Sequence, residues 1–339
     1  MASTPETLVA PQGTLLLTRR DIAELLDLDE CIAVVERAFK LHAEGKTLPP
    51  GVLGIKSSAG GFHIKAAGLE LGRTYFAAKI NANFSQNMKQ FGLPGIQGII
   101  VLCDGENGYP LALMDSIEIT IQRTGAATAV AAKHLARPDA TVATICGCGN
   151  QGRVQLQAIA RVCPLERVYA FDNDENQAER FSEELSGVLK IEVKAVRDLV
   201  NAVRQSDVCV TCTPSRRPFL NRGDVRPGTF IAAVGADSPE KQELDPRLMV
   251  SNKIVVDILE QCATIGELHH ALERGLVTRE HVHAELSEVV AGTKSGRTSP
   301  EEIIIFDSTG TALQDVAAAA VVYEKAVTAG RGVTMKLAG

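Results

Sequence analysis

A glycine-rich segment carries the sharpest chemical signal in this sequence. The stretch ICGCGNQG spaces Gly147, Gly149 and Gly152 as G-x-G-x-x-G, between a short apolar run and an amphipathic one. At such a strand-to-helix turn the first glycine permits the bend, the second admits a pyrophosphate and the third allows close helix packing. Asn150 and Gln151 open the helix, whose free N–H groups would hold phosphates. These residues predict a dinucleotide site.

An acidic residue on the next predicted strand bears on which dinucleotide binds. Asp172 ends the run RVYAFD, about 20 residues beyond the last glycine of the motif. A carboxylate there accepts hydrogen bonds from ribose hydroxyls and repels a 2′-phosphate, so Asp172 favours NAD over NADP. Asp174 is near enough to share this role, whereas Arg180 lies too far into the following helix to hold a phosphate.

Charged residues inside apolar runs are candidates for binding a substrate. Lys79 lies in the strand-like run AAKINANF, and Arg123 lies on an otherwise apolar helix in ITIQRTGAA. A buried cation is costly unless an anion pairs with it. The pattern leaves two partners open, a substrate carboxylate or an internal Asp or Glu. Asp237 follows the run GTFIAAVGA, where it either acts at the ligand-binding edge of a sheet or caps the turn at Ser238–Pro239.

Alternating elements must position these residues. After Pro138, short apolar runs alternate with amphipathic stretches, which predicts βαβ units and a parallel sheet. Helices are expected at Ile117–Leu135 and Thr311–Ala329, on either side of this region. The predicted fold is therefore α/β, with a Rossmann doubly wound sheet (138–309) inserted in a discontinuous α+β domain (1–137 plus 310–339). Further elements of that second domain are predicted at Asp29–Glu44 (helix), Gly51–Phe84 (β), Gln97–Cys103 and Pro110–Met114 (strands).

Composition excludes several classes of function. The chain has 339 residues, enough for two domains, and its 45% apolar and 22% charged residues are typical of a globular protein. A net charge of -6 gives no basic field for nucleic acid. The run Leu15–Leu17 is too short for a signal peptide, and no run approaches the roughly 20 apolar residues of a membrane span. We therefore expect a cytoplasmic protein without nucleic-acid or membrane partners.

Eight cysteines raise the question of a metal or redox site. Cys146 and Cys148, and Cys209 and Cys212, are closely spaced pairs of the kind found in such sites. Both pairs lie in β-branched, apolar runs, where cysteine packs as a small hydrophobic residue. We therefore predict buried thiols and no metal.

Long motifs resemble the ornithine cyclodeaminase/μ-crystallin family, which includes archaeal-type alanine dehydrogenases, cyclodeaminases and ketimine reductases. The resemblance covers nearly the whole chain, and the motifs come in the family's order: GLPGIQGIIVL, GYPLALMDSIEITIQRTGAATAVAAKHLA, CGCGNQG, TCTPSRRPFL, VGADSPEKQELD, HAELSEVVAG and IFDSTGTALQD. The loop VGADSPEKQELD and the stretch from HVHAELSEVVAG to FDSTGTALQD look nearest to the alanine dehydrogenase branch.

The resemblance assigns roles residue by residue. Lys79 and Arg123 match cations that hold the substrate carboxylate, and Asp237 matches the acid beside the α-carbon. Asp237 and Lys79 are the expected catalytic residues. Asp237 also separates the chain from the μ-crystallin branch, where a non-acidic residue is typical. Further cofactor contacts, near the phosphates and the nicotinamide, are implied for Thr124 and Ser308, and Thr213 matches a position that lines the NAD cleft.

One position departs from the family pattern. A basic residue often comes shortly after a Pro-Pro or Pro-Glu pair in the first strand of the site, but this chain has Gly51 after Pro49-Pro50. The candidates to replace that cation are Lys56, His63 and Lys65. Of these, Lys65 in HIKAAG is best placed, and both His63 and Lys65 are included in the predicted substrate site. His63 aligns with a carboxylate of ornithine cyclodeaminases, which weakens a diamine substrate, although Glu70 lies nearby and His63 could be an ordinary strand histidine.

The resemblance implies an NAD-dependent oxidoreductase acting at the α-amino carbon of a small amino acid, as an alanine dehydrogenase or an imino-acid reductase. Two other functions stay open: an ornithine cyclodeaminase-type ammonia lyase that uses NAD catalytically, and a non-catalytic NAD-binding protein. The expected partners are a small amino acid, 2-oxo acid or imino acid as substrate and a second copy of the chain in a homodimer.

Overall fold

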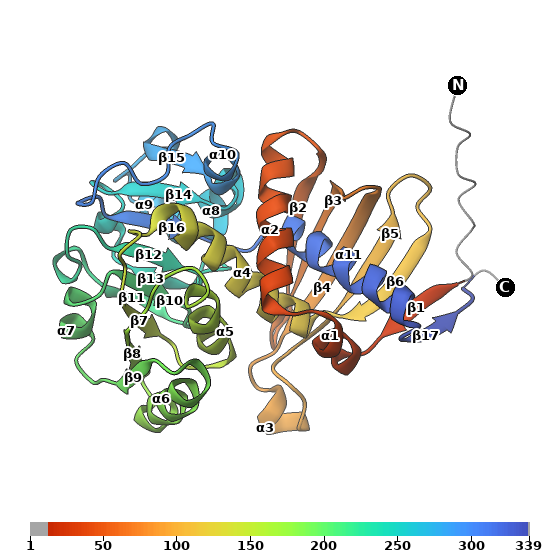
Figure 1. Cartoon of the computed structure of the whole chain (residues 1–339), viewed down its shortest axis with the longest axis horizontal. Coiled ribbons are helices and arrows are strands. Elements are labelled where there is room, and N and C mark those ends of the chain that lie inside the picture. The colour runs from red at the N-terminus through yellow and green to blue at the C-terminus, as the bar shows by residue number, and fades with distance from the viewer. Residues whose placement is uncertain (1–12, 338–339) are drawn as a thin grey trace.

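The computed structural model describes residues 13–337 and contains two large sheets with helices packed on them (Figure 1). One sheet has seven strands in the order β17-β1-β6-β5-β4-β3-β2. Its strands are β1 (Thr14–Leu17), β2 (Thr47–Lys56), β3 (Gly61–Glu70), β4 (Thr74–Asn83), β5 (Ile96–Asp104), β6 (Pro110–Asp115) and β17 (Val333–Met335). Its helices are α1 (Arg19–Leu25), α2 (Leu28–Ala43), α3 (Asn87–Phe91), α4 (Ile117–Leu135) and α11 (Ala312–Ala329).

The other large sheet has eight parallel strands in the order β15-β14-β16-β12-β10-β7-β8-β9. Its strands are β7 (Val142–Cys146), β8 (Arg167–Phe171), β9 (Glu192–Ala195), β10 (Val208–Thr211), β12 (Phe230–Ala233), β14 (Lys253–Val256), β15 (Val282–Glu285) and β16 (Ile304–Asp307). Its helices are α5 (Asn150–Ile159), α6 (Glu175–Leu189), α7 (Leu199–Arg204), α8 (Leu259–Ile265), α9 (Glu267–Glu273) and α10 (Leu286–Val290). A small sheet pairs β11 (Arg216–Leu220) with β13 (Gln242–Leu244).

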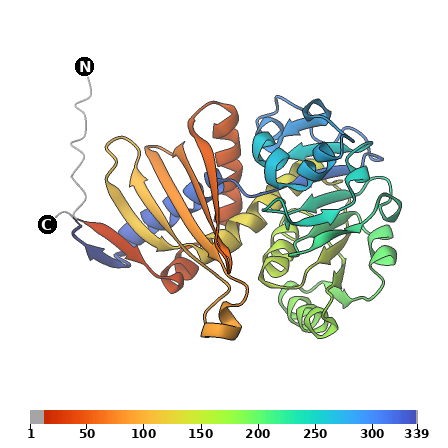
Figure 2. The same ribbon diagram turned by 180° about the vertical axis from the view of Figure 1, so that it is seen from behind.

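The predicted α/β class with a doubly wound parallel sheet is confirmed by this topology. The chain leaves the seven-stranded sheet through α4 and returns to it through the segment between β16 and α11 (Figure 2). On this topology we propose the two domains expected from the sequence, 138–309 and 1–137 plus 310–339. Residues 1–12 and 338–339 of these ranges lie outside the described residues. No helix in the described part of the chain is long and apolar enough to cross a membrane.

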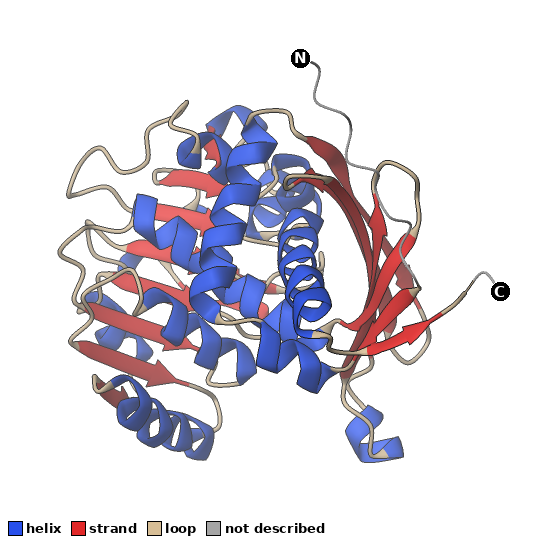
Figure 3. Cartoon of the chain, turned by 45° about the vertical axis from the view of Figure 1, so that its right-hand side comes forward, coloured by secondary structure: helices blue, strands red, loops and turns tan. Residues whose placement is uncertain are grey.

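The seven-stranded sheet carries its helices on one face and leaves the other bare (Figure 3). Helix α11 packs against β3 and β4 on the covered face. Side chains alternate along each strand, so the odd-numbered Lys65 and Lys79 point to the covered face and the even-numbered Ile64 and Ile80 to the bare one. The sheet therefore presents two chemically different surfaces.

Two details of the fold differ from the expectation. Strand β2 begins at Thr47 and includes Pro49-Pro50, ahead of the predicted start at Gly51. An edge strand tolerates proline because one of its sides makes no ladder hydrogen bonds, and the pairing with β3 shifts its register here. Strands β1 and β17 were not predicted, because runs of four and three residues give too little periodicity.

Candidate active site

The glycine-rich loop lies between β7 and α5, as the motif predicts. Gly147 has a φ of +102°, in the left-handed region, and a Cβ on Gly152 would collide with the carbonyl oxygen of Gly147. These two positions require glycine for backbone reasons. A Cβ on Gly149 would meet nothing within 4 Å. No side chain caps the start of α5 at Asn150–Gln151, so its first N–H groups are available to an anion.

Asp172 lies beside this loop at the end of β8. One of its carboxylate oxygens accepts the Cys148 N–H at 2.8 Å, and the other accepts the Asp174 N–H at 3.0 Å. Asp174 instead caps α6 by accepting the Asn176 N–H. The geometry therefore places Asp172, rather than Asp174, against the glycine-rich loop.

Three cations meet between the two sheets. Lys65 and Lys79 are paired across β3 and β4, Arg123 comes from α4, and each is at most 6% exposed. A single carboxylate, Asp315 of α11, pairs with Lys79 at 2.8 Å and with Arg123 at 3.0 Å. Burial lowers the pKa of Lys79 to about 7, and the charge of Arg123 adds to that fall while Asp315 opposes it. The cluster thus has more positive than negative charge in a desolvated place, which favours binding of an anion.

Lys65 connects this cluster to the parallel sheet. Its ammonium donates to the carbonyl oxygens of Thr309 and Gly310, at 2.8 and 2.6 Å, in the loop that follows β16. Among residues 13–337 no carboxylate lies within salt-bridge distance of Lys65. Burial, reinforced by the charge of Arg123, lowers the pKa of Lys65. The ammonium therefore uses two of its three N–H donors on backbone carbonyls and none on a carboxylate of the described residues.

Asp237 follows β12 and faces this region from the other side. Its side chain is 49% exposed and pairs with the Lys241 ammonium at 2.6 Å. Desolvation opposes ionisation of Asp237, but Lys241, with help from Lys65 and His63, outweighs it and lowers the pKa of the acid. Desolvation lowers the pKa of His63, and the charge of Asp237 opposes that change. Residues from both large sheets therefore interact electrostatically here. In the described chain Asp237 makes no capping hydrogen bond to a backbone N–H.

The sequence pattern of the ornithine cyclodeaminase/mu-crystallin family matches residues 12–330. The chain belongs to this family. An alanine dehydrogenase of Archaeoglobus fulgidus is 41% identical over 326 residues, which are 95% of this chain and 98% of that protein. The family predicted from the motifs is thereby confirmed.

Solved structures of family members share the whole fold. The structure of an archaeal alanine dehydrogenase dimer with bound NAD is 41% identical, has a TM-score of 0.92, and covers 96% of this chain and 100% of its own. Delta(1)-pyrroline-2-carboxylate reductase of Thermococcus litoralis, in complex with NADH and L-proline, is 37% identical with a TM-score of 0.90, over 95% of this chain and 100% of its own.

Three further residues were matched to cofactor contacts of the family. Thr213 follows β10 and lies against Gly147, and its N–H and hydroxyl both donate to Glu243. The hydroxyl of Ser308 donates to Asp257 at 3.3 Å, and that of Thr124 donates to the Thr120 carbonyl at 2.7 Å. Each hydroxyl therefore has a protein partner, and the cofactor contacts remain predictions for this member of the family.

Sequence reasoning missed the acids that organise this family member's site. Asp315 is the acid of the cation cluster, and its signal was an acid in the first turn of the Ala-rich helix α11. Three further buried carboxylates accept hydrogen bonds from backbone N–H groups. Glu243 accepts from Gly235 and Thr213, Glu267 accepts from residues 243 and 244, and Asp307 accepts from residues 267 and 268. Desolvation raises the pKa of Asp307 to about 7.

The closely spaced cysteines of this family member behave as packed thiols. All eight cysteines are free, and Cys146, Cys148 and Cys209 are buried. Burial raises the pKa of Cys148 to about 12 and that of Cys212 well above its ordinary value, which disfavours the reactive thiolate. Among residues 13–337 the grouping that could hold a metal contains no cysteine and consists of His269, His270 and Glu273.

Proposed function

We propose that this protein is an NAD-dependent oxidoreductase that acts on the α-amino carbon of a small amino acid, or on the corresponding imino acid. The observation that carries this proposal is the cluster of Lys65, Lys79 and Arg123 near Asp237, in which Asp315 is the one carboxylate of residues 13–337 within ion-pair distance of the three cations. A ligand carboxylate supplies the missing negative charge. The relatives named above, an alanine dehydrogenase and a pyrroline-2-carboxylate reductase, support an α-amino or α-imino carboxylate as substrate.

NAD is the cofactor we propose. Support comes from the glycine-rich loop, from Asp172 beside it, and from family structures that hold NAD or NADH. Gly149 and the first N–H groups of α5 would hold the pyrophosphate, and Asp172 would accept the ribose hydroxyls. When bound, NAD accepts or returns a hydride.

The chain's own residues then orient and stabilise the substrate. Two or three cations fix its carboxylate, which holds the neighbouring carbon in one place and lowers the entropic part of the barrier. As that carbon becomes an iminium, the ionised Asp237 stabilises the positive charge and takes or returns a proton of the attacking water. The ion pair with Lys241 keeps Asp237 ionised for this purpose.

A substrate screen tests the proposal. Purified protein is incubated with NAD or NADP and single amino acids, and in reverse with NADH, 2-oxo acids and ammonia or methylamine. We expect reduction of NAD by a small amino acid such as alanine, or oxidation of NADH by an imino acid. Ammonia and a cyclic product from ornithine without net NADH would establish the lyase instead. Tight NADH binding with no turnover of any substrate would leave a non-catalytic binding protein.

Gly149→Ala separates cofactor binding from folding. The side-chain methyl meets no protein atom in this structure, so the melting temperature is expected to stay within about 2 °C of wild type. The same methyl would lie where the pyrophosphate approaches, so the NADH dissociation constant should rise by about 10-fold or more. Fluorescence titration of NADH and a thermal melt measure the two effects. Gly152→Ala is the matched control, and it should lose both binding and stability because its methyl collides with Gly147.

A homodimer through the bare face of the seven-stranded sheet is the assembly we propose. Leu53, Ile64, Ile80 and Ile99 are register neighbours and form an apolar row across four strands. Leu53, Ile80 and Ile99 are 55%, 37% and 41% exposed, which is unusual for a contiguous apolar patch on a monomer. The archaeal alanine dehydrogenase relative is a dimer.

Ile80→Glu is expected to dissociate this dimer, because it introduces a charge at the centre of the apolar row. Light scattering on a size-exclusion column should then give a mass near the 36.1 kDa of one chain. Val188→Glu is the control, since Val188 is also exposed, at 61%, but lies on α6 of the other sheet. Equal masses for both variants would contradict an interface on this face.

A further inference from the structure

Asp257 lies fully buried just past the end of β14, next to the loop that follows β16. The two strands are adjacent, with Val256 opposite Asp307, so both chain segments emerge at the same edge of the sheet. The Asp257 carboxylate accepts the Gly310 N–H at 2.6 Å, the Thr309 hydroxyl at 3.1 Å and the Ser308 hydroxyl at 3.3 Å. One buried acid therefore holds three consecutive residues, 308–310.

The opposite side of the same loop carries groups of the proposed substrate site. Its carbonyl oxygens at Thr309 and Gly310 accept the Lys65 ammonium. Gly310 has a φ of +76°, and a Cβ there would collide with the guanidinium of Arg123, so the loop also lies against that cation. Gln261 of α8 adds two hydrogen bonds, to the Thr309 hydroxyl and the Gly310 carbonyl, at 2.7 and 2.9 Å.

We infer that Asp257 is a positioning residue for substrate binding: by fixing residues 308–310 it sets the places of the Lys65 ammonium and the Arg123 guanidinium that receive the substrate carboxylate. This inference rests on the proposed function. A loop without Asp257 would leave its backbone N–H and two hydroxyls without their acceptor, and the carbonyls that hold Lys65 would lose their fixed position.

The negative charge of Asp257 also supports substrate binding, because it favours the protonated form of Lys65. Two cations disfavour protonation of Lys65: Arg123 and Lys79, its register neighbour on β4. Three acids favour it: Asp237, Asp315 and Asp257. Removing the Asp257 charge should therefore lower the pKa of Lys65 further. As the pH rises, the substrate affinity of the variant should therefore begin to fall at a lower pH than that of the wild type, because the cationic form of Lys65 binds the substrate carboxylate.

Asp257→Asn tests the inference, because the amide keeps the shape of the side chain: its oxygen can still accept the Gly310 N–H and the Ser308 hydroxyl, and its NH2 group can donate to the Thr309 hydroxyl. We expect the KM for the amino acid to rise by about 10-fold, equivalent to the loss of one charge-assisted hydrogen bond. The alkaline limb of kcat/KM should move to lower pH. In a Lys65→Met background the same substitution should raise KM by clearly less than about 10-fold, because the part of the effect that acts through Lys65 is already lost and only the part through Arg123 remains.

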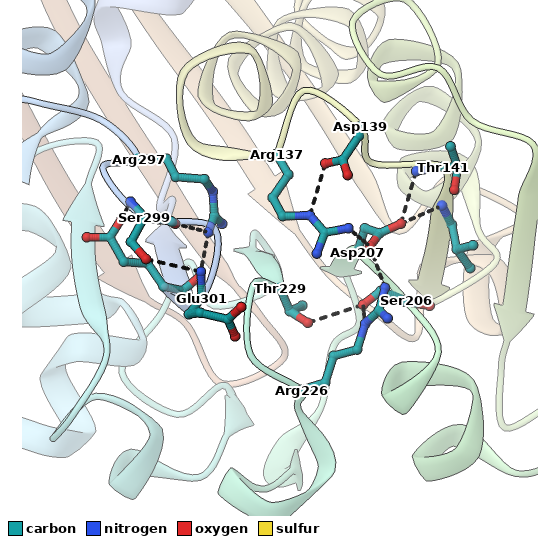
Figure 4. Close-up of polar contacts among 12 residues, drawn as sticks. Arg137, Asp139, Thr141, Ser206, Asp207, Arg226, Thr229, Arg297, Ser299 and Glu301 are labelled. Atoms are coloured by element: carbon teal, nitrogen blue, oxygen red, sulfur yellow. Dashed lines mark hydrogen bonds and ion pairs between the residues drawn. The ribbon is translucent and has the colours of Figure 1, made fainter.

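Asp207→Asn is the matched control. Asp207 is also a buried acid of the parallel sheet, but it lies at the start of β10, where it accepts the Thr141 and Val142 N–H groups and pairs with Arg137 and Arg226 (Figure 4). The Asp207→Asn substitution should lower the melting temperature without changing the KM for the amino acid. An equal rise of KM in both variants would mean that general destabilisation is responsible, and an unchanged KM in Asp257→Asn would equally overturn the inference.

A binding measurement keeps this test separate from that of the proposed function. The melting temperature is followed with increasing pyruvate, the oxo acid of alanine, in the presence of NADH. If wild type shows neither a shift nor turnover with any substrate, the proposed function fails. If wild type is stabilised and Asp257→Asn responds at the same pyruvate concentrations, Asp257 has no positioning role.

Discussion

Asp237→Asn is expected to lower kcat by on the order of 100-fold or more, while NADH binds with wild-type affinity. The amide has nearly the same shape but neither stabilises a developing iminium nor accepts a proton from water. Asp237 is half exposed and held by one ion pair, to Lys241, so its replacement should not unfold the chain. Steady-state kinetics and fluorescence titration of NADH measure the two quantities.

Glu240→Gln provides the control for this experiment. Glu240 lies in the same loop and is similarly exposed, at 48%, but its ion pair is with Lys56, and no cation of the proposed substrate site acts on its carboxylate. Its replacement should leave kcat unchanged within about twofold. Turnover of Asp237→Asn within about threefold of wild type would show that the acid assignment is wrong, since general acid–base help is worth far more than that.

Lys65→Met should raise the KM for the amino acid by on the order of 100-fold and leave the fold intact. The buried ammonium has only two carbonyl oxygens as partners in the described structure, and its burial beside Arg123 is unfavourable. Methionine has a similar length and removes that desolvation cost, so the free energy of unfolding should change by no more than about 1 kcal/mol. Kinetics at saturating NAD and urea unfolding test both parts.

The opposite pattern would identify Lys65 as structural. A large loss of stability with an unchanged KM would show that its ammonium serves only to hold the loop at residues 309–310. Lys56→Met is the comparison, because Lys56 is an exposed cation on the neighbouring strand β2 and pairs with Glu240. Its KM should be that of the wild type, although it was also a candidate to replace the cation missing at Gly51.

Local patterns predicted most of the fold because each element has a clear period. The glycine-rich turn and the long helices α4 and α11 were predicted within a residue or two, since capping and apolar periodicity are local properties. Short strands such as β17 and the loop-bound helix α3 gave no comparable signal. Strand β17 is stabilised by pairing with β1, far away in the chain, and α3 has only five residues, too few to show a helical period.

The partners of buried charges could not be predicted either, because they too come from distant segments of the chain. The sequence indicated that Lys79 and Arg123 needed an anion and left open whether it was internal. The structure gives a mixed answer, since Asp315 serves both cations and leaves an excess of positive charge. Asp315 lies 192 positions after Arg123 in the chain, so no spacing rule connects them. Asp257 was missed in the same way, because its partners emerge from a neighbouring strand.

Strands β3 and β4 carry the binding cations on one face and the proposed contact between subunits on the other, so one pair of strands positions both. A turn of three residues, Leu71–Arg73, joins these strands and sets which residues face which way. One residue added there would slide β4 by a single position, turning Lys79 outward and Ile80 inward. Catalysis and assembly would then fail together, so the length of this turn is fixed by both at once.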